Sequence, residues 1–172
     1  WQSSLLAKPL RTSADIRYIV SPALRTRETA REALAGKAVV PELDQDLREV
    51  DFGAWEGKTF AEIEAADPEA VTRWAAYEAD FSFPAGEGIA AFRERVGRAG
   101  VRIAADPADT VAVFTHAGVI RALICHYLAL ESKNYLYFDV KPASLTTILV
   151  DSGNGRGVLA GLNDRCHLED AR

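Results

Sequence analysis

Methionine is absent from the 172 residues, and cysteine occurs only twice. Cys125 and Cys166 lie far apart and form no C-x-x-C pair, which argues against a disulfide framework and a zinc site. We therefore expect two reduced thiols in a cytoplasmic protein. Because the chain opens with Trp1 and has no initiator methionine, we also expect these residues to be part of a longer translated product.

Long apolar runs and an excess of positive charge are also missing. No run approaches the ~20 residues needed to span a bilayer, so no membrane association is expected. Charged residues make up 26% of the chain with a net charge of −5, which argues against a general nucleic-acid surface. An anionic ligand must then be bound by a local group of Arg or His. The 48% of hydrophobic residues suffices for one core, so residues 1–172 are expected to form a single domain.

Hydrophobic periodicity predicts alternating strands and helices. We expect strands at 16–20, 39–41, 110–114, 145–150 and 157–162, and helices at 3–10, 22–34, 60–77 with a break at Asp67-Pro68, 89–106 and 117–130. The strand at 110–114 is almost wholly apolar, which is typical of a central parallel strand covered on both faces. The Gly- and Asn-rich link 151–156 indicates a hairpin. This order predicts a three-layer α/β/α fold, mostly parallel, with a hairpin toward one side.

Two predicted strand ends carry groups that could bind an anion, because ligands of parallel sheets bind beyond the carboxyl ends of the strands. After the first strand, Ser21 is expected to cap a helix that begins at Pro22 and places Arg25 in its first turn, near free N–H groups. After the strand at 110–114 stands His116, with Ala117 opening the next helix. Arginine binds phosphate in bidentate fashion, and histidine can pair with a second phosphate oxygen.

Two loops add the remaining candidates. A carboxylate from the acidic loop 43–57, such as Glu49, could protonate a leaving oxygen if it reached the same rim of the sheet. Trp55 and Phe83 could line a substrate pocket, although packing in the core is the more common role of such aromatic residues. Glu87 could contact substrate or simply lie in solvent. Each candidate has a plainer structural explanation, but their occurrence together in this order favours phosphoryl transfer.

The same residues lie in phrases that resemble one family. SPALRTRETA, LREVDFGAWEG, FPAGEG and THAGVIRAL are similar to motifs of the histidine phosphatase superfamily, the phosphoglycerate mutase-like enzymes. The resemblance implies a metal-independent phosphomonoester hydrolase that acts on a small phosphorylated metabolite through a phosphohistidine, so we expect no metal and no other cofactor. It implies that Arg25 binds phosphate, that Glu49 is the general acid and base, and that His116 steadies the transferred phosphoryl group. The residues expected to bind substrate are Ser21, Trp55, Phe83, Glu87 and Ala117.

The resemblance has departures. The family's first motif, Arg-His-Gly at the end of a central strand, supplies the nucleophilic histidine and is not among these residues. We therefore expect the domain to be incomplete at its N-terminus and to lack that strand. Gly88 stands where the family usually has serine. Of the remaining histidines, His126 is expected to serve packing and His167 to lie at the surface, with no metal spacing for either.

Three functions remain open from the sequence. The phrase FGAWEGKTF resembles the phosphatase branch more than the mutase branch, so hydrolysis is favoured. The alternatives are phosphoglycerate mutase-type transfer and a phosphate-binding pseudophosphatase without turnover. The physiological substrate is not indicated, and both a monomer and a homodimer are compatible with the sequence.

Overall fold

The computed structural model describes residue 5 and residues 15–171, so most of the helix expected at 3–10 lies outside the described residues. The longer elements are β1 (Ile16–Val20), α2 (Leu24–Ala33), β2 (Glu42–Leu43), α3 (Phe60–Ala66), α4 (Pro68–Ala75), α5 (Ile89–Ala104), β3 (Thr110–Phe114), α6 (Ala117–Tyr127), β4 (Leu145–Asp151) and β5 (Arg156–Asp164). In the part of the chain that is described, no helix combines the length and apolarity required to cross a membrane.

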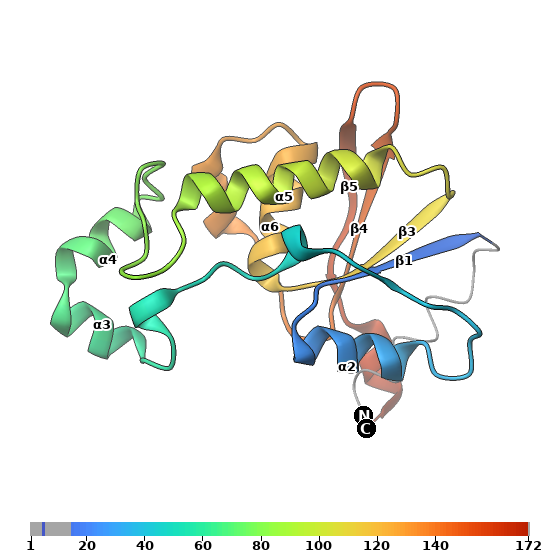
Figure 1. The fold of residues 1–172 in the computed structure, drawn as a ribbon, viewed down its shortest axis with the longest axis horizontal. Coiled ribbons are helices and arrows are strands. Elements are labelled where there is room, and N and C mark those ends of the chain that lie inside the picture. Colours follow the sequence, from blue (N-terminus) through green and yellow to red (C-terminus); the bar gives the residue numbers. More distant parts are fainter. Residues whose placement is uncertain (1–4, 6–14, 172) are drawn as a thin grey trace.

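A parallel sheet with the order β2-β1-β3 forms the middle layer. Its side chains alternate between two cores, as the period of a strand requires. Tyr18 and Val20 pack with α2 on one face, whereas Ile19 and Val113 belong to the larger core built with α5 and α6. Figure 1 shows α2 on one side of these strands and α5 and α6 on the other. The predicted three-layer α/β/α fold is confirmed.

The strand arrangement differs in detail from the prediction. Among the described residues β1, not β3, occupies the middle of the parallel sheet, and β3 pairs only with β1. The predicted hairpin is confirmed as the antiparallel pair β4-β5, but it forms a sheet of its own. It packs its partly buried side chains Ile148 and Val150 on the larger core. The further strand that the resemblance implies stays a prediction.

Two local predictions were wrong. The short strand expected at 39–41 lies at Glu42–Leu43, because these are the residues that pair with the end of β1, and Val40 is 97% exposed. Ser21 does not cap a helix that begins at Pro22. The helix α2 begins at Leu24 after Ala23, without a side-chain cap, since the Ser21 hydroxyl is engaged elsewhere.

The break at Asp67-Pro68 is confirmed. Thr59 and Glu62 form a capping box at the start of α3, so both the side chain and the backbone of Thr59 are bonded. Asp67 then caps α4 by accepting from the Ala70 N–H, and Pro68 occupies the first helical position. The pair α3-α4 extends away from the sheet (Figure 1).

Candidate active site

A cleft of about 640 Å³ is lined by three segments of the chain that all reach the carboxyl-end rim of the parallel sheet. The turn after β1 contributes residues from Pro22 to Arg25, the loop after β2 contributes residues from Gln45 to Glu56, and the loop before α5 contributes Gly86 and Glu87. This is the rim at which ligands of parallel sheets bind.

The turns after β1 and β3 are joined by hydrogen bonds. The Ser21 N–H donates to the Phe114 carbonyl at 2.9 Å, which continues the pairing of the two strands. Ser21 is fully buried, and its Oγ lies 2.8 Å from His116 Nε2. Arg25 Nε donates to His116 Nδ1 at 3.1 Å. Because Nδ1 accepts this bond, the ring proton of the neutral imidazole lies on Nε2 and is donated to Ser21.

His116 is held neutral by its surroundings. Burial, together with the positive charges of Arg25 and Arg95, lowers the pKa of His116 to about 4. Only 6% of the residue is exposed, and its ring is fixed on both nitrogens. The side chain therefore stands as an oriented, uncharged ring beside the Arg25 guanidinium, a group that can bind an anion.

Glu49 reaches the same rim from the loop after β2. One carboxyl oxygen accepts from the Gly118 N–H in the first turn of α6 at 3.1 Å, and the other accepts from the Val50 N–H at 3.1 Å. Burial raises the pKa of Glu49, while these two hydrogen bonds and the charges of Arg25 and Arg95 oppose that rise. A raised pKa keeps the proton on the carboxyl group to higher pH, which suits a general acid.

Gly118 makes this placement of Glu49 sterically feasible. A Cβ atom at position 118 would overlap Glu49 Oε1 and would come within 2.7 Å of the Tyr135 hydroxyl oxygen. Tyr135 is buried, and burial together with the nearby Glu49 raises its pKa to about 12. Neither the close contact at Gly118 nor the position of Tyr135 beside Glu49 was predicted from the sequence. The TH-x-G phrase contained the glycine, but no local pattern pointed to Tyr135.

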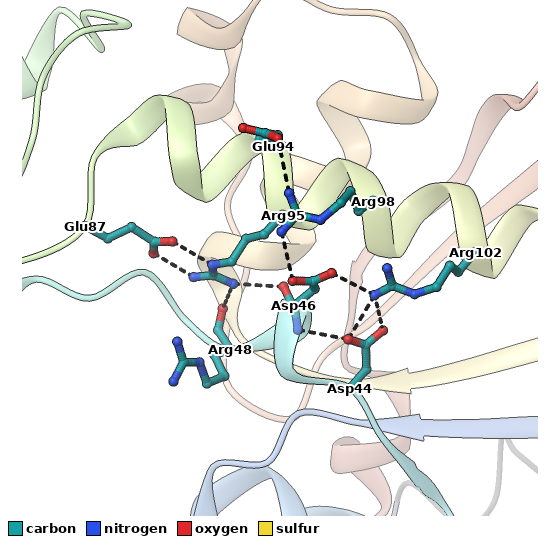
Figure 2. Close-up of polar contacts among 8 residues, drawn as sticks. All are labelled: Asp44, Asp46, Arg48, Glu87, Glu94, Arg95, Arg98 and Arg102. Atoms are coloured by element: carbon teal, nitrogen blue, oxygen red, sulfur yellow. Dashed lines mark hydrogen bonds and ion pairs between the residues drawn. The ribbon is translucent and has the colours of Figure 1, made fainter.

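Arg95 of α5 was also missed. Its side chain is 9% exposed and is bonded to the backbone of the Glu49 loop as well as to Glu87 (Figure 2). The available signal was the spacing of Arg95, Arg98 and Arg102, which puts the three on one face of a helix. Such a stripe resembles a solvated face, and the backbone carbonyls that Arg95 binds lie 46–49 positions away in the sequence.

The candidate substrate-binding residues lie in three places. Ser21 and Ala117 flank His116 and are not among the residues that line the cleft. Glu87 lines the cleft with its carboxylate bonded to Arg95. Trp55 and Phe83 lie with ring centroids 5.2 Å apart, in an aromatic cluster rather than among the residues that line the cleft. The further members of that cluster are Phe52, Phe60, Trp74 and Phe81.

The other two histidines lie away from the cleft. His126 packs across the face of α5 at Gly97 and Gly100, in agreement with a packing role. The prediction that His167 lies at the surface was wrong, because only 9% of this residue is exposed. No cluster of three or more His, Cys, Asp or Glu residues suited to a metal ion occurs within residues 15–171.

Comparison with known proteins gives a consistent result. The model of the histidine phosphatase superfamily (branch 1) matches residues 1–165. Phosphoserine phosphatase 1 of Hydrogenobacter thermophilus is 30% identical over 97% of this chain and 79% of its own length. The adenosylcobalamin/α-ribazole phosphatase of Salmonella typhimurium is 29% identical over 95% of this chain and 81% of its own length. A bifunctional protein of Mycobacterium tuberculosis is 34% identical, but the match spans only 38% of its length.

Solved structures show the same fold. The α-ribazole phosphatase of Shigella flexneri matches with a TM-score of 0.81 and 24% identity, over 95% of this chain and 81% of that chain. A mycobacterial glucosyl-3-phosphoglycerate phosphatase in complex with inorganic phosphate matches with a TM-score of 0.82 and 25% identity, over 95% of this chain and 84% of that chain.

Proposed function

Because the chain belongs to branch 1 of the histidine phosphatase superfamily, we propose that it hydrolyses phosphomonoesters without a metal ion, through a phosphohistidine. The observation that carries the proposal is the convergence of Arg25, His116 and Glu49 at one rim of the sheet. An arginine, an oriented imidazole and a carboxyl group with a raised pKa are the groups that transfer of a phosphoryl group to and from a histidine requires.

The proposed reaction has two steps. In the first, the histidine of the family's Arg-His-Gly motif, which is not among these 172 residues, attacks phosphorus in line with the ester oxygen. An N–P bond forms, the P–O ester bond breaks, and Glu49 donates its proton to the leaving alcohol. In the second, Glu49 takes a proton from water, which attacks phosphorus and releases inorganic phosphate from the histidine. Arg25 and His116 hold the phosphoryl oxygens throughout.

The substrate class we propose is a small phosphorylated metabolite. A cleft of about 640 Å³ is in the range of sites for small molecules. Its lining includes the side chains of Arg48, Asp51 and Glu56, so positively and negatively charged groups are both available to bind the rest of a polar ester. Relatives are named as phosphatases of phosphoserine and α-ribazole phosphate, which supports the same class.

The test is hydrolysis of phosphoserine and of p-nitrophenyl phosphate by the full-length gene product at mildly acidic pH in the presence of EDTA. Glu49→Gln keeps the size of the side chain and removes the proton that it donates, so we expect kcat/KM for phosphoserine, whose leaving alcohol needs that proton, to fall by about 10²–10⁴-fold. His116→Gln is expected to produce a loss of similar order because it removes the ring that steadies the phosphoryl group. The phosphorylated enzyme can be trapped by rapid quenching and then treated with acid. A phosphohistidine intermediate loses its phosphate in acid, whereas a phosphorylated serine keeps it.

The matched control is Glu28→Gln, which alters an exposed carboxylate of α2 outside the cleft and should leave kcat/KM unchanged. Turnover that depends on an added metal ion would contradict the proposal. Binding of inorganic phosphate without any turnover would favour the pseudophosphatase, and transfer of the phosphoryl group between phosphoglycerates would favour the mutase.

A further inference from the structure

We infer that Arg95 is a positioning residue for Glu49, and that the buried ion pair between Arg95 and Glu87 fixes where the general acid stands in the cleft. The inference rests on the role proposed for Glu49. It assigns to Glu87 a contact with the protein rather than with the substrate. It also assigns a function to helix α5, none of whose residues lines the cleft.

The bonds of Arg95 all lead to the loop that carries Glu49 or to Glu87. Nη1 donates to the carbonyl oxygens of Asp46 at 2.8 Å and Arg48 at 2.6 Å, and Nη2 donates to the carbonyl oxygen of Glu49 itself at 3.0 Å. Nε and Nη2 each donate to one carboxylate oxygen of Glu87 at 2.7 Å. Figure 2 shows the guanidinium group between Glu87 and the backbone of this loop.

This loop needs an external anchor. Between its short 3₁₀ turns at 45–47 and 53–55 the loop forms no strand or helix, so its buried carbonyl groups need donors from other parts of the chain. Arg95 supplies those donors from a rigid helix of 16 residues. Glu87 neutralises the guanidinium, which a buried charge requires, and its own backbone N–H donates to the Asp51 carbonyl at 2.9 Å.

Glu49 is thereby fixed at two points. Its backbone carbonyl is held by Arg95 of α5, and its side chain is held by the Gly118 N–H of α6. A shift of about 1 Å in a reacting group can cost two orders of magnitude in rate. Loosening the first anchor should therefore weaken proton donation even though Glu49 is still present.

The outer arginines of α5 make a weaker contribution. Arg98 and Arg102 contact Asp44 and Asp46 through side chains that are 53% and 51% exposed. Exposed ion pairs contribute little and are screened by salt, whereas Arg95 is buried and bonds the backbone. The positioning role is thus specific to Arg95, together with Glu87.

The experiment compares two substrates in the full-length gene product carrying Arg95→Lys, which keeps the positive charge but cannot make these five bonds. Phosphoserine is an alkyl ester, and its leaving group, the serine alkoxide, is strongly basic and needs a proton from the general acid. The p-nitrophenolate ion leaves readily without that proton. We expect kcat/KM to fall by about 100-fold for phosphoserine and by less than about tenfold for p-nitrophenyl phosphate. Glu87→Gln should also lower kcat/KM more for phosphoserine than for p-nitrophenyl phosphate, but by a smaller factor than Arg95→Lys. Arg93→Lys, an exposed arginine of the same helix, should change neither value.

A second readout does not depend on turnover. Amide hydrogen exchange of residues 46–51 should accelerate in Arg95→Lys and Glu87→Gln, and not in Arg93→Lys. Equal losses on the two substrates, or unchanged exchange in this loop, would overturn the positioning role. If the wild type hydrolyses neither substrate, the proposed function fails, and the exchange experiment alone decides whether Arg95 anchors the loop.

Discussion

Single atoms decide the geometry around Glu49. Its carboxyl group lies against a backbone position, Gly118, where there is no room for a side chain, and the Tyr135 hydroxyl oxygen also lies close to that position. The contact between Glu49 and Gly118 joins residues 69 positions apart in the sequence. Steric exclusion at one glycine therefore determines whether the general acid can occupy its place.

Gly118→Ala is expected to displace Glu49 while leaving the fold intact, because alanine is well suited to a helix. The new methyl group would occupy the position of Glu49 Oε1, so the bond from the residue 118 N–H would be lost. We expect kcat/KM for phosphoserine to fall by at least about tenfold, as for other losses of geometry at a reacting group. Circular dichroism and the urea midpoint report whether the fold is kept. Full activity in this variant would show that the close contact is unimportant.

The sequence was sufficient to predict the residues that the family motifs contain. Arg25, Glu49 and His116 were each predicted, and the structure brings all three to one rim of the sheet. Their chemical roles stay predictions. Arg95 could not be predicted, because three of its five bonds go to backbone carbonyls 46–49 positions away, which leave no mark on the sequence.

Among the elements, the helices α5 and α6 are in direct contact. Glycines at positions 97 and 100 of α5 face the side chain of His126, and the Tyr127 hydroxyl donates to the Gly100 carbonyl at 2.9 Å. Because α6 begins directly after His116 and α5 carries Arg95, this contact sets the distance between the two supports of the site.

Gly97→Ala and Gly100→Ala form a matched pair that tests the contact. A Cβ atom at 97 would meet His126 at 3.6 Å, an ordinary contact, so we expect the full helix-propensity gain of about 0.5–1 kcal/mol. A Cβ atom at 100 would lie 2.7 Å from the His126 ring, which must move, so the gain should be smaller. Urea unfolding measures both gains. In a His126→Ala background, which removes the ring, Gly100→Ala should give the same gain in stability as Gly97→Ala. Equal gains from the two single substitutions would contradict this account.

Elements with strong periodicity were predicted well, and weakly specified ones were not. The helix α5 and the strands β1 and β3 appear where their apolar residues recur. The position of β2 was missed, because only its pairing with Ile19 and Val20 defines it. Ser21 was mistaken for a helix cap because its hydroxyl group bonds a histidine 95 positions away.

For the whole molecule, the neutral His116 links folding to pH. Its pKa is about 4 in the folded chain, against an ordinary value of 6.5 in an unfolded one. Between these values the unfolded chain binds a proton that the folded chain does not, so this group favours the folded state fully above about pH 6.5, and less as the pH falls toward 4. Glu49, whose pKa is raised, acts in the opposite direction.

The unfolding free energy of the wild type should therefore fall more steeply between pH 6.5 and pH 4.5 than that of His116→Gln. The difference in slope is at most ~1.4 kcal/mol per pH unit, the value for one proton. Urea denaturation at a series of pH values in a constant-ionic-strength buffer measures it. Parallel curves for the two proteins would mean that His116 titrates normally in the folded chain.

The aromatic cluster beside the cleft has an optical consequence. Trp55, on the loop that continues from Glu49, packs edge to face against Trp74 of α4 with ring centroids 6.1 Å apart, and Trp1 is the one remaining tryptophan of the chain. Excitation energy passes between two indoles at this separation, and the polarisation of their emission depends on their mutual orientation. A movement of Trp55 on the Glu49 loop relative to α4 thus changes the polarisation of the intrinsic fluorescence, so the protein carries an internal reporter of this loop without an added label.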